Sequence, residues 1–178
     1  MRPIRLCLSL CLLLTAAAAA SCGGSPQGDA LEGSPPEVED GILHGVTDME
    51  YVIAHFPVFR SRTELVSVPP ATVRYLRELR EPVRLKLFMG TWCHDAQVHV
   101  PHLFQALQQA DNSRISLQVV GMDRQKGDRD GFCTTHDIAF SPTLVVEHEG
   151  GELGRVVEVP ADDMASDLVA ILRTTLSR

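Results

Sequence analysis

The feature that most constrains the fold is a short apolar run followed by a long amphipathic segment. Val83 to Met89 is mainly apolar, which is typical of a strand buried in a sheet. After a brief turn, Cys93 to Ala110 carries apolar residues at helical spacing, so a helix is predicted there. The next apolar run is Ile115 to Val120. Two buried strands joined by a helix are expected to be parallel neighbours in one sheet.

The last part of the chain predicts an antiparallel addition to this sheet. Thr143 to Glu147 and Leu153 to Val159 are two strand candidates, separated by Gly150 and Gly151, which suit a tight hairpin. The remaining predicted elements are helices over Pro69–Arg80, Asp130–His136 and Asp162–Leu176. The expected class is therefore α/β, with a mixed central sheet and helices on both faces.

Residues 1–21 have the composition of a secretory signal peptide. Arg2 and Arg5 precede an apolar run from Leu6 to Ala20 that ends in small residues, which is the usual order of n-region, h-region and cleavage site. As a helix this run would rise about 22 Å, which is short of the roughly 30 Å hydrocarbon core of a bilayer. Export is therefore favoured over a membrane-spanning helix.

The sequence Ala-Ala-Ser before Cys22 resembles the lipoprotein box of bacteria, in which the cysteine is acylated and becomes the first mature residue. The box usually has Leu where this chain has Ala19, and residues 18–20 would also suit ordinary signal cleavage. With Gly23 rather than Asp after the cysteine, the resemblance implies a lipid anchor in the outer membrane of a bacterial cell envelope, facing the periplasm. The alternative is a soluble periplasmic protein.

Composition limits the partners and the thiol chemistry. Lys plus Arg number 16 and Asp plus Glu number 23, and no stretch concentrates positive charge, so nucleic-acid binding is not expected. Attachment to a membrane would come from acyl chains, because an acidic protein gains nothing from an anionic bilayer.

Cys7 and Cys11 would leave with the signal and Cys22 would be acylated. Cys93 and Cys133 would then be the thiols exposed to an oxidising compartment.

Four regions are predicted along the chain. Residues 1–21 are the signal peptide, and residues 22–45 are a flexible linker rich in Gly, Ser, Pro, Asp and Glu. Residues 46–70 are expected to be an extension packed on the domain, a short helix followed by irregular chain because Pro57 interrupts the apolar pattern. Residues 71–178 are the folded domain.

Cys93 lies where a buried strand is predicted to end and a helix to begin, next to Trp92. Free N–H groups and the helix dipole at such a position favour a thiolate, the reactive form of sulfur. A small hydrophobe at a strand end is the alternative interpretation of this cysteine. Asp95 is either an acid or base beside the thiol or a carboxylate that complements the helix dipole.

These elements together resemble the thioredoxin fold. The features that carry the resemblance are, in order, a strand, the sequence Gly-Thr-Trp-Cys-His-Asp, a helix containing Pro101, Ser141-Pro142-Thr143 before a late strand, and a Gly-Gly hairpin. The resemblance spans about residues 71–178 and is nearest to bacterial thioredoxin-like proteins with a Trp-Cys-x-Asp motif. It implies that Pro142 is cis and lies against Cys93. It also implies a surface for an extended substrate that consists of Trp92, Ser141, Pro142 and Thr143.

Two departures from the family pattern bear on the function. A dithiol thioredoxin has a second Cys three residues after the first, where this chain has Ala96, so no near neighbour would resolve a mixed disulfide. The buried carboxylate that thioredoxins carry before the nucleophile is Leu87 here, which removes the customary proton acceptor. Cys133 is the remaining candidate for a resolving thiol, and it could equally be a buried apolar thiol.

No cofactor and no metal site are predicted. His94, His99 and His102 follow Cys93, but His99 and His102 fall deeper along the helix, so one tetrahedral shell is hard to close. The leading hypothesis is monothiol thiol–disulfide exchange, in which Cys93 forms mixed disulfides with protein or small-molecule thiols. The alternative is a non-catalytic binding module that uses the same groove for a protein partner.

Overall fold

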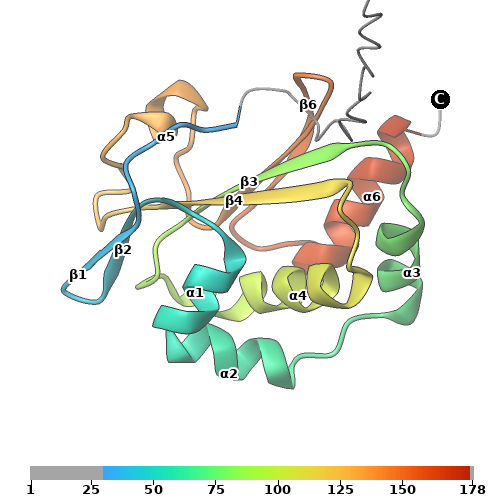
Figure 1. The fold of residues 1–178 in the computed structure, drawn as a ribbon, viewed down its shortest axis with the longest axis horizontal. Coiled ribbons are helices and arrows are strands. Elements are labelled where there is room, and N and C mark those ends of the chain that lie inside the picture. The colour runs from blue at the N-terminus through green and yellow to red at the C-terminus, as the bar shows by residue number, and fades with distance from the viewer. Residues whose placement is uncertain (1–29, 177–178) are drawn as a thin grey trace, which may run out of the picture.

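The computed structural model describes residues 30–176 and is built around one mixed sheet (Figure 1). The sheet has six strands in the order β1-β2-β4-β3-β5-β6. The strands are β1 Glu37–Glu39, β2 Ile42–Thr47, β3 Val83–Met89, β4 Ile115–Gly121, β5 Thr143–His148 and β6 Gly151–Val157. The helices are α1 Met49–His55, α2 Pro57–Leu65, α3 Pro70–Glu78, α4 His94–Ala110, α5 Phe132–Thr135 and α6 Met164–Leu176.

The central strand pair is parallel. β3 and β4 pair from Val83 opposite Ile115 to Met89 opposite Gly121, and α4 forms the connection between them. The other strand pairs within residues 30–176 are antiparallel, including the β5–β6 hairpin. This strand order, with α4 between the parallel strands and a hairpin and helix at the end, confirms the predicted α/β class and the thioredoxin-like arrangement.

The two faces of the sheet are covered unequally (Figure 1). Leu85, Leu87 and Met89 of β3 are fully buried in the main core, which they share with residues of α1, α2, α3, α4 and α6. Phe88 points to the other face, because side chains alternate along a strand. It belongs there to a smaller cluster that includes Cys133 of α5. Both faces therefore carry helical cover, but most of it lies on one side.

Residues 30–45 correct the predicted linker, because they are folded onto the domain. They contain β1 and the first part of β2, which form a hairpin, and Leu43 is fully buried. The Leu43 N–H donates to Thr91 Oγ1 at 3.2 Å. The side-chain amide of Gln118 accepts from the Leu31 N–H at 2.9 Å and donates to its carbonyl at 3.1 Å. These partners are distant in sequence, so the local composition of the segment gives no sign of them.

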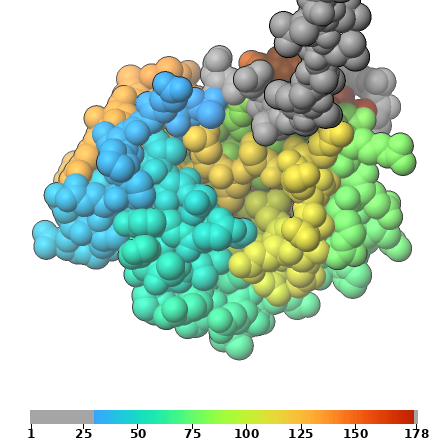
Figure 2. Space-filling model, viewed as in Figure 1, coloured from blue at the N-terminus to red at the C-terminus, as the bar shows by residue number. Residues whose placement is uncertain are grey.

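The same N-terminal segment also holds the loop before α5 (Figure 2). Ser34 donates its N–H and its hydroxyl to the Asp130 carboxylate, at 3.0 and 2.7 Å. Arg129 forms ion pairs with Glu37 and Glu39, at 2.6 and 2.5 Å. The predicted signal peptide and residues 22–29 lie outside the described residues. Within residues 30–176, no helix has the length and apolar character needed to cross a bilayer.

A second correction concerns residues 57–65, which were expected to be irregular. They form α2, because Pro57 takes the first helical position, where its missing N–H loses no hydrogen bond. Phe59 of α2 is fully buried. Its ring centroid is 6.5 Å from those of Phe56 and Phe104. This part of the chain therefore contributes to the main core.

Candidate functional site

Cys93 is the N-cap residue of α4, directly after the turn that ends β3. Its N–H donates to the Gly90 carbonyl at 3.0 Å, and its own carbonyl accepts from the Gln97 N–H at 3.1 Å. The thiol Sγ lies 3.1 Å from the Ser141 carbonyl oxygen, to which it donates. Only 8% of the Cys93 surface is exposed. The structure thus places this cysteine at the helix start expected from the sequence, with its sulfur held against the loop before β5.

The loop before β5 is fixed to the turn that carries the cysteine. The Ser141–Pro142 peptide bond is cis, and Ser141 Oγ accepts from the Gly90 N–H at 2.9 Å. Thr143 Oγ1 donates to the Phe140 carbonyl at 2.8 Å. The Ser141 and Thr143 side chains are buried and serve these internal contacts. A substrate would therefore meet the backbone of this loop rather than the two hydroxyl groups.

Trp92 lies between the end of β3 and the loop that follows β4. Its indole Nε1–H donates to the Met122 carbonyl at 3.2 Å. A Cβ atom at Gly90 would lie 2.5 Å from the indole ring, so a glycine is needed for the ring to pack here. The half-buried indole is thereby held rigidly next to Cys93.

Asp95 lies in the first turn of α4 and is half-buried. Its carboxylate accepts no hydrogen bond from any residue in the range 30–176. This arrangement favours the simpler role, in which the carboxylate complements the helix dipole. Leu87 is fully buried in the main core, so the position of the family's buried carboxylate is apolar.

Cys133 is placed poorly for the predicted resolving role. Neither Cys93 nor Cys133 is in a disulfide, and the two belong to separate hydrophobic clusters. The Cys133 N–H donates to Asp128 Oδ1 at 2.6 Å. Burial, and then the adjacent Asp128 carboxylate, raise the pKa of Cys133 from 9.0 to about 12. A thiol that stays protonated is a poor nucleophile, so the alternative of a buried apolar thiol describes Cys133 better.

The histidines of α4 do not converge on the cysteine. His94 is exposed, and His99 and His102 are half-buried farther along the helix. Burial lowers the pKa of His99, and the negative charge of Asp95 opposes part of this effect. Within the described part of the chain, no group of three or more His, Cys, Asp or Glu side chains could hold a metal ion.

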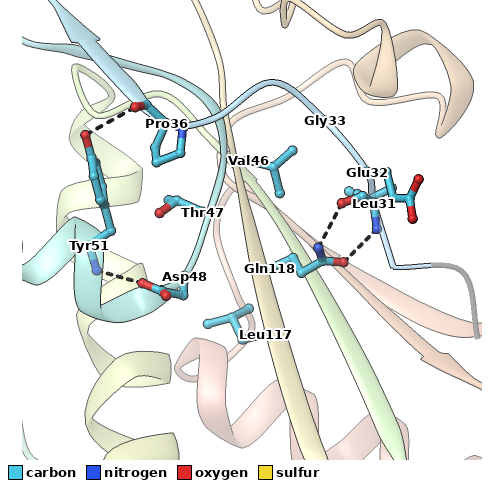
Figure 3. Close-up of a pocket in the computed structure, with 10 residues that line it drawn as sticks. All are labelled: Leu31, Glu32, Gly33, Pro36, Val46, Thr47, Asp48, Tyr51, Leu117 and Gln118. Carbon is cyan, nitrogen blue, oxygen red and sulfur yellow. Dashed lines mark hydrogen bonds between the residues drawn. The ribbon is translucent and has the colours of Figure 1, made fainter. Parts of the chain in front are cut away.

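A cleft of about 550 Å³ opens at a different place, between the N-terminal segment, β2 and β4 (Figure 3). Its walls include Gly33, Val46, Asp48, Tyr51, Leu117 and Gln118. Gln118 precedes Met122, the residue that contacts Trp92, by four positions. At a rise of about 3.3 Å per residue along a strand, the two residues are about 13 Å apart. The cleft is therefore separate from the Cys93 site.

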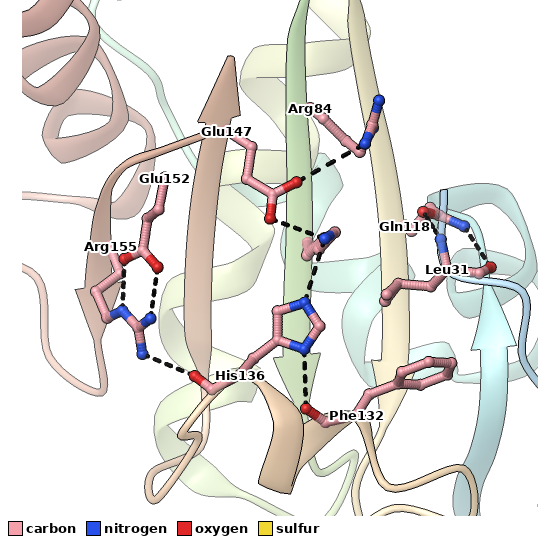
Figure 4. Close-up of polar contacts among 9 residues, drawn as sticks. Leu31, Arg84, Gln118, Phe132, His136, Glu147, Glu152 and Arg155 are labelled. Atoms are coloured by element: carbon pink, nitrogen blue, oxygen red, sulfur yellow. Dashed lines mark hydrogen bonds and ion pairs between the residues drawn. The ribbon is translucent and has the colours of Figure 1, made fainter. Parts of the chain in front are cut away.

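Sequence reasoning missed a buried ionic network on the sheet face opposite the main helices (Figure 4). Lys86 is 5% exposed. Its Nζ lies 2.8 Å from Glu147 Oε1 and 3.2 Å from His136 Nε2. Arg84 lies on the same face, with an N–O distance of 3.8 Å to Glu147. The available signal was the alternation of Arg84 and Lys86 with apolar residues along β3.

The loop after β4 was also missed. It places Arg124 Cζ 5.7 Å from the centroid of the Trp92 ring and Lys126 Nζ 4.8 Å from that of Phe140. The signal in the sequence was the two basic residues, Arg124 and Lys126, that follow shortly after β4, whose neighbour β3 ends shortly before the cysteine.

Comparison with known proteins adds a likeness of fold. No protein-family model and no curated protein matches the chain. A protein of unknown function from Pseudomonas aeruginosa superposes with a TM-score of 0.52 at 19% identity, over 72% of this chain and 81% of that one. An HIV epitope-scaffold protein gives 0.49 at 24% identity, over 70% and 81%. Thioredoxin f2 of Chlamydomonas reinhardtii gives 0.40 at 16%, over 57% and 85%. At these identities the likeness concerns the fold alone.

Proposed function

We propose that this chain is an exported thioredoxin-like protein whose Cys93 forms mixed disulfides by thiol–disulfide exchange with substrates that carry a disulfide. The observation that carries the proposal is the position of the Cys93 sulfur, at the start of α4 and 3.1 Å from the carbonyl that precedes cis-Pro142. Free N–H groups of the first helical turn stabilise negative charge on a sulfur at this position. The nearby backbone offers an extended chain a place to lie against the thiol.

The proposed exchange begins when Cys93 loses its proton and its hydrogen bond to the Ser141 carbonyl. The thiolate attacks one sulfur of a substrate disulfide, a new S–S bond forms, and the substrate bond breaks. The departing sulfur takes up a proton. Ala96 stands where a resolving cysteine would be, and Cys133 is held protonated. An external thiol must therefore attack the mixed disulfide and release Cys93.

The alternative is a non-catalytic module that binds a protein partner in the same groove. Two observations favour it: the low exposure of Cys93, and the S–H group that donates inward to Ser141. Leu87, in place of a proton acceptor, fits this alternative as well.

Labelling with a defined disulfide separates the two functions. The Cys133→Ser variant is incubated with hydroxyethyl disulfide, and adducts are located by mass spectrometry of peptides. Exchange predicts one adduct on Cys93, removed by excess thiol and absent from a Cys93→Ser control. If Cys93 forms no adduct in the folded protein but does so once the protein is unfolded, the binding module is favoured.

A turnover assay tests the monothiol mechanism itself. The wild type should reduce insulin slowly, and Ala96→Cys should raise the rate by supplying a resolving thiol at the helix start. Leu87 would limit the gain, because no buried carboxylate accepts the second proton. If the wild type turns over as fast as Ala96→Cys, the monothiol mechanism is wrong.

We also propose that the protein is anchored in the bacterial outer membrane through acylated Cys22 and faces the periplasm. Since residues 30–45 are folded onto the domain, only the stretch between Cys22 and Ala30 would separate anchor and domain. The mass of the mature N-terminus tests this placement. An unmodified terminus upstream of Cys22 would instead indicate a soluble periplasmic protein.

A further inference from the structure

Two pairs, each of a cation and an aromatic ring, involve residues adjacent in sequence to Cys93 and Ser141. In the first, Arg124 Cζ lies 5.7 Å from the centroid of the Trp92 ring, and Trp92 is the residue before the cysteine. The indole is fixed by its hydrogen bond to the Met122 carbonyl, two residues before Arg124. The guanidinium therefore lies against the ring of the residue that precedes the cysteine.

The second pair lies at the loop before β5. Phe140 precedes Ser141, whose carbonyl accepts the hydrogen bond from the Cys93 sulfur. The Phe140 side chain is 45% exposed, although most large apolar side chains of the domain are buried. Lys126 Nζ lies 4.8 Å from the centroid of its ring. A half-buried indole and an exposed phenyl ring, each with a cation nearby, thus flank Cys93 and Ser141 in the sequence.

One short loop carries both cations and is held by its first residue. Asp123 Oδ1 accepts from the N–H groups of Gln125 and Gly127, at 2.8 and 2.9 Å. The Asp123 N–H donates to the Gly127 carbonyl at 2.9 Å. These bonds fix the loop and occupy one oxygen of its own carboxylate.

The charge of the two cations is only partly offset. Lys126 lies 3.9 Å from Glu158, and both side chains are more than a third exposed. Arg124 is exposed and forms no ion pair with any residue between 30 and 176. A further negative charge comes from the Asp95 carboxylate, in the first turn of α4. The chain as a whole has a formal charge of −7, so an unpaired guanidinium at this rim runs against its general charge.

We propose that Arg124, assisted by Lys126, selects disulfide substrates that carry a carboxylate close to the sulfur. This inference rests on the proposed exchange at Cys93. The two rings would contact the apolar part of such a substrate, and the guanidinium would pair with its carboxylate, which it can grip with two N–H donors. A positive charge at the rim also raises the local concentration of anionic substrates and the rate at which they arrive.

The test compares three disulfide probes of different charge on the Cys133→Ser protein. The probes are dithiobis-nitrobenzoate, which is anionic, dithiodipyridine, which is neutral, and cystamine, which is cationic. Arg124→Gln should slow Cys93 labelling by the anionic probe about fivefold at low ionic strength, leave the neutral probe unchanged and speed the cationic one. Arg124→Lys keeps the charge but loses the paired N–H donors, so it should retain only part of the anionic rate.

Two further variants sharpen the test. Arg114→Gln removes an exposed arginine from the opposite end of β4 and should change none of the three rates. Glu158→Gln frees Lys126 from its ion pair and should speed labelling by the anionic probe. A uniform slowing of all probes by Arg124→Gln, or no change with any of them, would overturn charge selection while the exchange at Cys93 stands. Failure of every probe to label Cys93 would overturn the proposed function, and with it this inference.

Discussion

Cys133 should be nearly inert to alkylation in the folded protein. Its pKa is raised from 9.0 to about 12, first by burial and then by the Asp128 carboxylate. At pH 8 the thiolate fraction would be about one in ten thousand, against about one in ten for an ordinary thiol, since each pKa unit is a factor of ten. Ionisation alone therefore predicts labelling about a thousandfold slower than in the unfolded chain.

Iodoacetamide labelling of the Cys93→Ser variant, followed by peptide mass spectrometry, measures this rate for Cys133 alone. Between pH 7 and pH 10 the rate should rise about tenfold per pH unit without a plateau, because the whole range lies below the folded pKa. The same protein unfolded in denaturant supplies the reference rate. Asp128→Asn should accelerate labelling, since it removes the charge but leaves the burial.

Labelling of folded Cys133 within tenfold of the unfolded rate would refute this reasoning. The same group also predicts a dependence of stability on pH. Because the folded state holds the Cys133 proton more tightly than the unfolded state, its contribution to stability is full below about pH 9. That contribution is lost as the pH rises from there towards 12.

Three changes in stability, each measured by denaturant unfolding, test the packing. Glu147→Gln should lower the free energy of unfolding by about 3 kcal/mol, because it leaves the buried Lys86 ammonium without its carboxylate. As a control, Arg129→Gln removes an exposed ion pair and should leave the denaturation midpoint nearly unchanged. Equal losses of stability in the two variants would contradict the buried role of Glu147. Thr63→Val should stabilise the protein by about 1 kcal/mol, because the Thr63 hydroxyl is buried without a hydrogen-bond partner. A loss of stability would show that the hydroxyl has a partner. Phe59→Ala should cost about 3–5 kcal/mol, and a loss below about 1 kcal/mol would remove α2 from the core.

The strongest hydrophobic patterns gave the most accurate predictions. Val83–Met89 is a strand with the predicted bounds, and Cys93 precedes a helix that ends at Ala110 as expected. The last hairpin is shifted, because its turn residues with positive φ are Glu149 and Gly150, and β6 already begins at Gly151. Local pattern therefore identifies an element more reliably than it sets the residue at which a turn begins.

Features that depend on distant partners could not be predicted in the same way. The folding of residues 30–45 onto the domain depends on Thr91 and Gln118, which a composition rich in polar residues does not reveal. The approach of Ser141 to Cys93 was expected only from the resemblance, since their separation in sequence gives no distance. The surroundings of Cys133 depend on the path of the loop before α5, which brings the Asp128 carboxylate into contact with this cysteine.

The hydrogen bonds of the N-terminal segment also determine how the domain would bear a mechanical load. Tension from a tether ahead of Ala30 would pull first on the bonds of Leu31 and Ser34, far from the thiol along the chain. Behind them, the Leu43 N–H is joined to the hydroxyl of Thr91, two residues before Cys93. Force that passed the outer bonds would therefore be shared between this contact beside the reactive thiol and the pairing of β2 with β4.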